Sequence, residues 1–316
     1  MKIAVLFPGQ GSQFIGMGSE FISSSADCAA IMEMAASVCD FPLVKIIAEG
    51  PMEELTRAAV LQPAITTANL ICLKALQDAL PESVEPYCYA GHSLGEFSAL
   101  CGAGAVSVAD TITLVERRGY LMQREGDRKP GGMRAILGLG VEEIEQLVAS
   151  YRGNGVVTVA NYNTAQQIVI SGSMEGLDWV SAAAEERGAK VVVLKVSVAN
   201  HCPLVEGAVE DFSRVIDSVD VGVPKSTVYF NMTAAPEDDP SRIRQMMARQ
   251  IVSRVRWYES ILAMLAEGVD TFIEVGPKSV LKGMMRKIVP KGDKVTAVQF
   301  DTPEALEKCI AKLNFG

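Results

Sequence analysis

The chain has 316 residues, which is long enough to bury a large core and to form two compact units. Hydrophobic residues make up 49% and charged residues 21% of it, the balance of a globular protein without long runs of charge. A formal net charge of -9 argues against nucleic acid as the main partner, and no apolar run approaches the length of a membrane span.

The cysteines and the N-terminus add further expectations. The 7 cysteines form no C-x-x-C pair and lie mostly in apolar segments, which is typical of reduced thiols in a cytoplasmic protein. Cys202 stands beside His201, but with no second ligand nearby we expect no metal site. The apolar segment Ile3–Phe7 is too short for a signal peptide and is ended by Pro8.

From Met1 to about Lys129, predicted strands and helices alternate, which indicates an α/β layered region with a mostly parallel sheet. Its predicted elements, in order, are a buried strand at 3–7, an amphipathic helix from 62 to about 80, a short strand at 87–90, a small apolar helix at 97–101 and a helix from 107 to about 123. The polar, glycine-containing segment 127–132 that follows is interpreted as a linker.

A different order of elements follows this linker. We predict a strand at 133–139, a helix at 141–151, strands at 156–160 and 167–171 joined by a polar turn at 161–164, a helix at 175–187 and a strand at 190–198. The order βαββαβ is that of the ferredoxin-like split βαβ unit. Residues 130–202 are therefore interpreted as a small domain inserted into a large one. The large domain is discontinuous, formed by 1–129 and 203–316, and its second part adds helices and two more strands at 226–231 and 271–275.

The most informative motif is Gly91-His92-Ser93-Leu94-Gly95, a G-x-S-x-G pattern between a predicted strand and a predicted helix. In that context the pattern is a nucleophile elbow, whose glycines allow a sharp turn from which the serine projects. The N-terminal N–H groups of the following helix suit the binding of an oxyanion. Without that context, the same pattern is also compatible with an ordinary glycine-rich turn.

The chain holds only two histidines, His92 and His201, and a serine nucleophile normally needs an adjacent base. His92 is next to Ser93 in the elbow, where neighbouring side chains diverge, so His201 is the better candidate. His201 lies where the chain leaves the small domain, so we expect the active site in the cleft between the two domains. Acidic residues are too numerous to single out one that orients the histidine, so the sequence alone leaves the third member open.

A set of short segments resembles, in order and spacing, the malonyl-CoA:acyl carrier protein transacylases. This family is related to the acyltransferase domains of polyketide and animal fatty acid synthases. The resemblance covers nearly the whole chain and is carried by residues 7–13, 62–64, 91–96, 115–119, 200–201, 249–250 and 274–277. It implies an α/β-hydrolase-like large domain with a ferredoxin-like insertion, which agrees with the order of elements above.

The resemblance also implies a reaction and residue roles. A malonyl group would pass from malonyl-CoA to the phosphopantetheine thiol of an acyl carrier protein through a seryl ester, in a ping-pong sequence without a metal or redox cofactor. Ser93 would be the nucleophile and His201 its base, with a carbonyl of Gln250 against the histidine. The backbone N–H groups of Gln10 and Leu94 would form the oxyanion hole.

Arg118 would hold the free carboxylate of the malonyl group, since a planar guanidinium matches a carboxylate with two charge-assisted hydrogen bonds. A substrate without that carboxylate would leave a desolvated charge unpaired. From the residues alone, Arg117 and Arg118 are read as a solvated helix edge, and only the resemblance singles out Arg118. Met122, one helical turn later, would pack either against the acyl chain or in the core.

Three positions depart from the family's usual pattern. Asn200 precedes the histidine where a Ser or Phe is usual, and because that position helps shape the acyl pocket, the tolerance for substituted malonyl groups stays open. Arg134 stands where a small residue is common, and Lys278 replaces a usual glycine.

A basic run at Lys278, Lys282, Arg286, Lys287 and Lys291 suggests where a partner docks. Carrier proteins of this kind are acidic, so productive docking on an enzyme of like net charge needs a local basic patch. Lys282, Arg286 and Lys287 have helical spacings that cluster their charges, although a solvated helix face has the same pattern.

Two other functions remain open at this stage. An esterase or acyl hydrolase acting on acyl-CoA or acyl carrier protein thioesters would use the same G-x-S-x-G motif. A catalytically dead docking scaffold is a third possibility, which the intact Ser93, His201 and Gln10 disfavour. We expect a monomer, and the sequence leaves open whether the carrier serves fatty acid or polyketide synthesis.

Overall fold

The structure is a computed structural model that describes residues 1–314, and it contains two separate β-sheets. The first sheet is five-stranded and parallel, in the order β7-β2-β1-β8-β9. Its strands are β1 (Ile3–Phe7), β2 (Cys88–Gly91), β7 (Thr227–Tyr229), β8 (Thr271–Val275) and β9 (Thr296–Phe300). This confirms the expected α/β protein with a parallel sheet.

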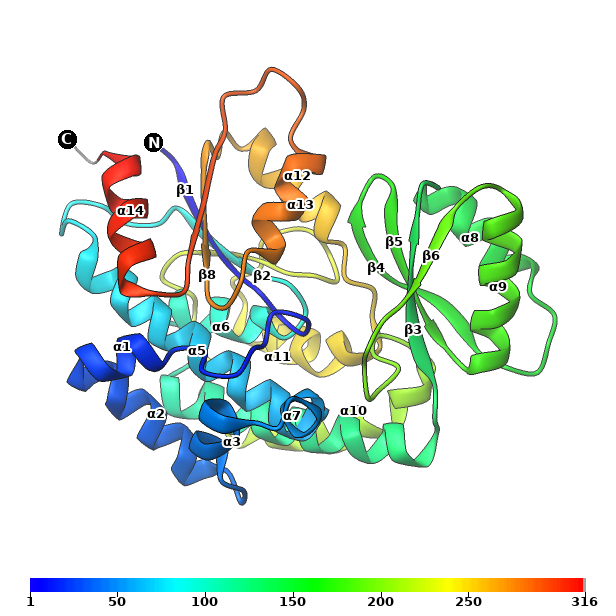
Figure 1. Ribbon diagram of the computed structural model, residues 1–316, viewed down its shortest axis with the longest axis horizontal. Helices are drawn as coiled ribbons and strands as arrows, with labels where there is room; N and C mark the ends of the chain where they lie inside the picture. The colour runs from blue at the N-terminus through cyan, green and yellow to red at the C-terminus, as the bar shows by residue number, and fades with distance from the viewer. Residues whose placement is uncertain (315–316) are drawn as a thin grey trace.

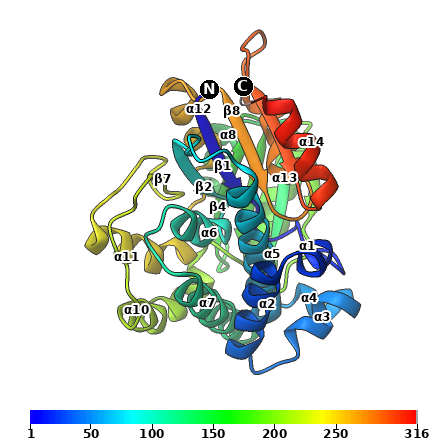
Figure 2. The same cartoon turned by 90° about the vertical axis from the view of Figure 1, so that its left-hand side faces the viewer.

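Helices cover both faces of the parallel sheet (Figures 1 and 2). Strand β1 is an unbroken apolar run because it is buried on both faces. Its side chains Ile3, Val5 and Phe7 pack with helices on one face of the sheet, at 58–79, 95–102 and 108–128. Ala4 and Leu6 pack with helices on the other face, at 257–266 and 280–288. The helices of this part are α1 (Ser19–Ser24), α2 (Ala26–Val38), α3 (Leu43–Glu49), α4 (Met52–Thr56), α5 (Ala58–Ala79), α6 (Gly95–Gly102), α7 (Val108–Arg128), α10 (Val209–Asp217), α11 (Pro240–Arg249), α12 (Trp257–Ala266), α13 (Val280–Ile288) and α14 (Pro303–Leu313), with 3₁₀ turns η1 (Pro203–Ala208) and η2 (Gln250–Val252).

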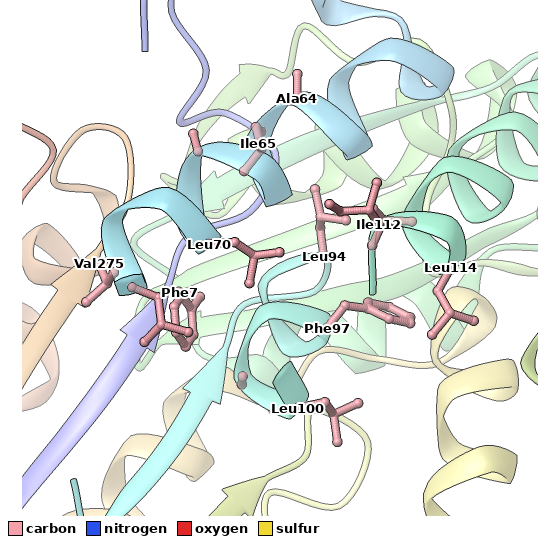
Figure 3. Close-up of a cluster of buried hydrophobic side chains, with 14 of the residues drawn as sticks. Phe7, Ala64, Ile65, Leu70, Leu94, Phe97, Leu100, Ile112, Leu114 and Val275 are labelled. Carbon is pink, nitrogen blue, oxygen red and sulfur yellow. The ribbon is translucent and has the colours of Figure 1, made fainter. Parts of the chain in front are cut away.

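Helix α5 runs through the centre of the core. It is long and apolar enough to cross a membrane by length and composition, so the expectation that no apolar run approaches that length was wrong. However, 83% of its most apolar 18-residue window is buried inside the protein. Figure 3 shows its side chains Ala64, Ile65 and Leu70 in one cluster with Phe7 of β1 and Leu94 of the elbow. A helix that is apolar on all sides is explained here by its burial within the core.

The second sheet is antiparallel, with strand order β4-β5-β3-β6. Its elements are β3 (Gly132–Leu137), α8 (Val141–Ser150), β4 (Val157–Thr164), β5 (Gln167–Gly172), α9 (Met174–Glu186) and β6 (Lys190–Val193), in the predicted order of strands and helices. One face packs against α8 and α9 (Figure 1), and the other presents Met133, Ala135 and Val169 to a cavity. Two backbone hydrogen bonds tie β4 to the parallel-sheet part: Tyr162 N–H to Val255 O, and Val255 N–H to Ala160 O, both 2.8 Å.

The predicted polar turn at 161–164 was wrong, because β4 continues through Thr164. Bulges in its pairing with β5 accommodate the polar residues, and Asn161 and Asn163 line the cavity instead of facing solvent. The predicted strand 190–198 ends at Val193, since Val196 N–H bonds the carbonyl of Leu194 and closes a turn.

Three other predictions about elements need correction. The C-terminal part supplies three strands rather than two, since β9 was missed. The small apolar helix forms, as α6, but begins at Gly95. Helix α7 continues to Arg128, into the expected linker, because ion pairs of Arg124 and Arg128 with the buried Glu125 hold its last turns. All seven cysteines are free thiols, as expected.

Two of the unusual residues now have a structural explanation. Arg134 on β3 donates to Leu177 O at 3.2 Å and Ser181 Oγ at 2.9 Å, and it pairs with Asp178, so it fastens α9 to the sheet. Lys278 has a φ of 61°, a left-handed conformation that explains why a glycine suits this position.

The turn from β2 into α6 depends on two glycines at which the chain passes very close to itself. A Cβ atom on Gly91 would overlap the backbone of Gly95, and one on Gly95 would overlap the carbonyl oxygen of Phe7 at the end of β1. These contacts bring β1, β2 and the first turn of α6 together at the elbow.

We therefore expect Gly95→Ala to lower the free energy of unfolding by at least ~1–3 kcal/mol, because the added methyl group must displace backbone atoms. The matched control is Gly283→Ala in α13, where a Cβ would meet nothing within 4 Å. That change should stabilise the protein by about 0.5–1 kcal/mol. Denaturant unfolding of both variants is the measurement, and equal effects would contradict the close approach at the elbow.

Candidate active site

Ser93 occupies the sharp turn between β2 and α6 with a φ of 51°, an uncommon value for a residue with a side chain. Asn231 secures this strained turn from the segment after β7. Its Oδ1 accepts from the Ser93 N–H at 2.6 Å, and its Nδ2 donates to the Gly91 carbonyl at 2.7 Å. The turn therefore presents the serine in a fixed orientation, as strained residues at functional sites commonly require.

The hydroxyl of Ser93 lies 2.7 Å from Nε2 of His201. The other ring nitrogen, Nδ1, is 3.0 Å from the backbone carbonyl oxygen of Gln250. Because a carbonyl only accepts, Nδ1 carries the proton and Nε2 of the neutral ring is free to accept from the serine. Burial is the main cause that lowers the pKa of His201 to about 3, and the positive charge of Arg118 is the second, so the ring is neutral.

His92 turns away from the serine, as the divergence of neighbouring side chains suggested. Its Nε2 lies 2.8 Å from Oδ1 of Asn163 on β4, and its ring packs edge-on against Trp257 with centroids 5.5 Å apart. Burial lowers the pKa of His92 as well. Its hydrogen bond joins the elbow to the antiparallel sheet.

The residues of the expected oxyanion hole lie beside Ser93. Leu94 follows it at the start of α6. Gln10 belongs to the loop after β1 and lines the same cavity as Ser93. Within residues 1–314, the backbone N–H groups of Gln10 and Leu94 have no protein acceptor. Both N–H groups are thus without a protein acceptor, one on a residue of the cavity wall and the other on the residue that follows Ser93.

A cavity of ≈ 200 Å³ lies between the two sheets and contains the serine and the histidine. Its wall is formed by the loop after β1, the elbow, the antiparallel sheet and α13, with Gln10, Ser93, Met133, Asn161, Asn163, Gln167, Leu194, Asn200, His201 and Met284 among its residues. A larger open hollow of ≈ 600 Å³ around Lys225 contains neither a serine–histidine pair nor a buried charge. The chemistry therefore identifies the smaller cavity.

Asn200 is 7% exposed and lies in this wall, where its Nδ2 donates to Oε1 of Gln10 at 3.1 Å. The hydrogen bond fixes the orientation of the Gln10 amide, whose Nε2 is buried and has no partner within the described chain. The departure at position 200 therefore gives the cavity an amide-lined wall next to the serine.

Arg118 is buried, with 2% exposure, so the residue-only reading of a solvated helix edge was wrong. Its Nη1 donates to Oε1 of Gln62 at 2.7 Å and its Nη2 to Oε1 of Gln250 at 2.8 Å, while Nε has no partner in the described chain. No carboxylate in residues 1–314 forms an ion pair with it. Burial lowers its pKa to about 10, which leaves it charged at neutral pH.

Arg118 and Met122 are not part of the cavity wall. Arg118 lies behind Ser93 and is linked to it through Gln250, whose Nε2 donates to the Ser93 carbonyl at 2.9 Å. Met122 is 1% exposed within the main core, 3.5 Å from Nε2 of Gln62. For Met122, the structure favours the core-packing alternative.

Three polar residues of this site had no role assigned from the sequence. They are Glu96, Asn231 and Gln62, each nearly or fully buried. Glu96 accepts from Gln250 Nε2 at 2.9 Å and from Asn231 N–H at 2.6 Å. Gln62 and Glu96 lie in segments that carry the family resemblance, and Asn231 ends a predicted strand, but none of these signals reveals the partner of the side chain.

The basic residues proposed for docking lie on α13, at the edge of the cavity. Val280, Leu281 and Met284 of this helix line the cavity, whereas Arg286 and Lys287 are exposed and Lys282 is half-buried. The three cations have no ion-pair partner within residues 1–314. The start of α13 is held by Glu274, whose carboxylate accepts from the Leu281 and Lys282 N–H groups at 2.9 and 2.8 Å.

Comparison with known proteins places this arrangement in a family. The family model described as an acyl transferase domain matches residues 5–299. The malonyl CoA-acyl carrier protein transacylase of Bacillus subtilis (strain 168) is 37% identical over 314 residues, covering 99% of this chain and 97% of that protein. The enzyme of the same name from Escherichia coli (strain K12) is 34% identical, covering 98% of this chain and 99% of its own.

Solved structures agree with the sequence matches. The malonyl CoA-acyl carrier protein transacylase of Coxiella burnetii has a TM-score of 0.93 at 32% identity, covering 99% of this chain and 98% of that one. A type II PKS acyl-carrier protein in complex with its malonyl-transacylase, PlMCAT:AntF, matches with a TM-score of 0.93 at 31% identity, covering 99% and 100%. The chain is a member of the acyl transferase domain family and, within it, of the malonyl CoA-acyl carrier protein transacylases.

Proposed function

We propose that this protein transfers a malonyl group from malonyl-CoA to the phosphopantetheine thiol of an acyl carrier protein, through an ester on Ser93. The observation that carries the proposal is the buried guanidinium of Arg118, which has no ion-pair partner in the described chain. It is linked through Gln250 to the pair of Ser93 and His201. The pair supplies acyl-transfer chemistry and the guanidinium supplies recognition of a carboxylated acyl group. Related proteins of this name support the choice of substrates.

In the first half-reaction, Ser93 Oγ gives its proton to Nε2 of His201 and attacks the thioester carbonyl of malonyl-CoA. The N–H groups of Gln10 and Leu94 bind the oxyanion that develops. The carbonyl–sulfur bond then breaks, and the CoA thiolate leaves with the proton from His201. The product is malonyl-Ser93.

In the second half-reaction, the carrier thiol gives its proton to His201 and attacks the ester carbonyl. The bond to Ser93 Oγ breaks and the serine regains the proton, so the enzyme is restored. The Gln250 carbonyl holds the ring in the required tautomer through Nδ1, the task of an Asp in hydrolase triads. No step needs a metal or redox cofactor.

Arg118 provides the selectivity for malonyl in this proposal. Two amide oxygens accept from its Nη atoms, whereas a carboxylate would match the planar guanidinium with two charge-assisted hydrogen bonds and also bring the opposite charge. The malonyl carboxylate therefore gains by pairing with this buried cation, which has no other anionic partner in the described chain. An acetyl group carries no negative charge and so cannot pair with Arg118.

The finer description of the fold is also a proposal. A nucleophile turn between a parallel strand and a helix supports an α/β-hydrolase-like large domain, residues 1–129 and 203–316. The strand order β4-β5-β3-β6 with two helices on one face supports a ferredoxin-like small domain, residues 130–202. We further propose a cytoplasmic monomer.

For the carrier protein, we propose docking on α13. Its free cations Lys282, Arg286 and Lys287 are on the helix whose other side lines the cavity, so a carrier bound there would have a short path to Ser93. A local basic patch attracts an acidic partner even though the net charge is -9.

Our first functional prediction is that Ser93→Ala abolishes the covalent adduct formed with malonyl-CoA, and His201→Ala slows its formation by orders of magnitude. Intact-protein mass spectrometry is the measurement. A stable malonyl adduct that a carrier protein discharges supports transfer, rapid release as free malonate supports a hydrolase, and no adduct supports a docking scaffold. Acylation of the Ser93→Ala variant would refute the assigned nucleophile.

The second prediction concerns selectivity. Arg118→Ala should strongly lower kcat/KM for malonyl-CoA and raise the relative use of acetyl-CoA, because the unpaired-charge penalty against acetyl disappears. Arg117→Ala, on the same helix but outside these contacts, is the matched control. An unchanged malonyl-to-acetyl ratio would remove Arg118 from the site.

The third prediction concerns docking. Reversing the charges of Arg286 and Lys287 together should raise the apparent KM for the carrier protein and weaken its dependence on salt. Acylation of Ser93 by malonyl-CoA should change much less. An equal fall in both half-reactions, or no change in either, would exclude α13 as the docking surface.

A further inference from the structure

Glu96 is a buried carboxylate that the proposed reaction does not use. It lies on the first turn of α6, 1% exposed, and no Lys, Arg or His within residues 1–314 forms an ion pair with it. Both its oxygens accept hydrogen bonds from neutral donors: Oε1 from Gln250 Nε2 at 2.9 Å, and Oε2 from Asn231 N–H at 2.6 Å. A buried ionisable group with such specific partners requires a reason for being there.

Glu96 acts through the side chain of Gln250, whose two N–H donors and amide oxygen all have partners. Its Nε2 donates one hydrogen to Glu96 and the other to the Ser93 carbonyl at 2.9 Å. Its Oε1 accepts from Arg118 Nη2 at 2.8 Å. A flipped amide would set its oxygen against two acceptors and its NH₂ group against the guanidinium, so only one orientation is compatible with the site.

We propose that Glu96 is a positioning residue that sets the malonyl-over-acetyl selectivity by holding the Gln250 amide with its oxygen toward Arg118. This inference rests on the function proposed above. Glu96 touches neither the substrate nor the reacting atoms, and acts only through Gln250.

The chemistry of position 96 favours a carboxylate over any isosteric group. Its two neighbours are both donors, so the residue must accept at both ends. A glutamine there would point its own NH₂ group either at the Asn231 N–H or at the Gln250 NH₂ group. One donor–donor contact is unavoidable, and the simplest relief is a rotation of Gln250 away from Arg118.

The negative charge of Glu96 also acts on Arg118 without direct contact between the two side chains. Glu96 and Arg118 attract each other, yet the amide of Gln250 stands between them. The negative charge therefore helps to keep Arg118 protonated inside the protein without occupying its guanidinium. A direct ion pair would neutralise the cation and fill the place that the substrate carboxylate needs.

Protonation of Glu96 should have the same effect as the glutamine. Burial raises the pKa of Glu96 to about 7, so its double-acceptor form predominates above that pH and is lost as the pH falls. Arg118 on α7 and the imidazoles His92 and His201 are the titratable groups near it. Burial lowers the pKa of His92 and lowers that of His201 to about 3, so both rings are shifted toward the neutral form.

The test is the ratio of kcat/KM for Ser93 acylation by malonyl-CoA to that by acetyl-CoA. Glu96→Gln should reduce this ratio about tenfold or more, the cost of disturbing one hydrogen bond to a charged group. In the wild type the ratio should fall from pH 8 to pH 6, and in Glu96→Gln it should stay flat. The matched control is Glu125→Gln, a carboxylate with 3% exposure on the helix of Arg118, which should leave the ratio unchanged.

A double-mutant cycle tests the route through Gln250. Gln250→Leu removes the side-chain contacts and keeps the backbone carbonyl that binds His201. In that background Glu96→Gln should cause no further loss of selectivity. Additive losses would show that Glu96 does not act through Gln250.

Other outcomes would overturn the proposal in different ways. If Glu96→Gln lowers acylation by malonyl-CoA and acetyl-CoA equally, Glu96 serves the elbow through Asn231 and not selectivity. If the ratio is unchanged while the melting temperature falls, its role is structural. Should Glu96→Gln fail to fold, a wild-type ratio that does not vary with pH would still refute the proposal. Failure of the proposed function is distinguishable, because the wild type would then form no malonyl adduct.

Discussion

Gln250 is bonded through its backbone carbonyl, its amide oxygen and its amide nitrogen to three different parts of the active site. The carbonyl accepts from His201, the amide oxygen accepts from Arg118, and the amide nitrogen donates to the Ser93 carbonyl. The residue begins the short η2 turn after α11, is fully buried, and has no spare donor on its side chain. Any displacement of this turn would therefore disturb the base, the cation and the nucleophile together.

The groups that hold the charged and reactive residues in place are mostly neutral amides. A carbonyl orients His201 where hydrolase triads use a carboxylate, and the oxygens of Gln62 and Gln250 hold Arg118 where an ion pair would be usual. Neutral acceptors satisfy the geometry of hydrogen bonding without cancelling charge. The site thus keeps a positive charge in a desolvated interior, and under the proposed function the malonyl carboxylate offsets the cost of burying it.

Much of the fold followed from the sequence because its signals are local. The apolar run of β1, the helix α7 and the G-x-S-x-G turn each depend on periodicity or turn chemistry within a short segment. The polar segment 161–164 was wrongly predicted as a turn, because a strand with polar side chains that face an internal cavity has the composition of a turn. Helix α7 exceeded its predicted end because ion pairs to Glu125 stabilise polar residues that look like a linker.

The site was predictable where residue types are scarce or where the family resemblance fixes a position. Two histidines leave one base, and the resemblance singled out Arg118, Gln10 and Gln250. Glu96 and Asn231 were not predictable, because their importance lies in partners far along the chain: the Asn231 N–H reaches Glu96 across 135 positions. Nothing in the sequence alone indicates which of many polar residues is buried or which atom it faces.

The proximity of Arg118 to the histidine links recognition of the acyl group to the strength of the base. Burial and, after it, the positive charge of the Arg118 guanidinium lower the pKa of His201 to about 3, far below the value that suits a general base. Under the proposed assignment, an arriving malonyl carboxylate neutralises Arg118 and removes its repulsion of a proton on His201, so the imidazole becomes more basic when the correct substrate is bound. An acetyl group leaves the repulsion in place. The charge of Arg118 would then favour malonyl over acetyl in two ways. It would hold the malonyl carboxylate, and it would allow His201 to activate Ser93 fully only when that carboxylate is bound.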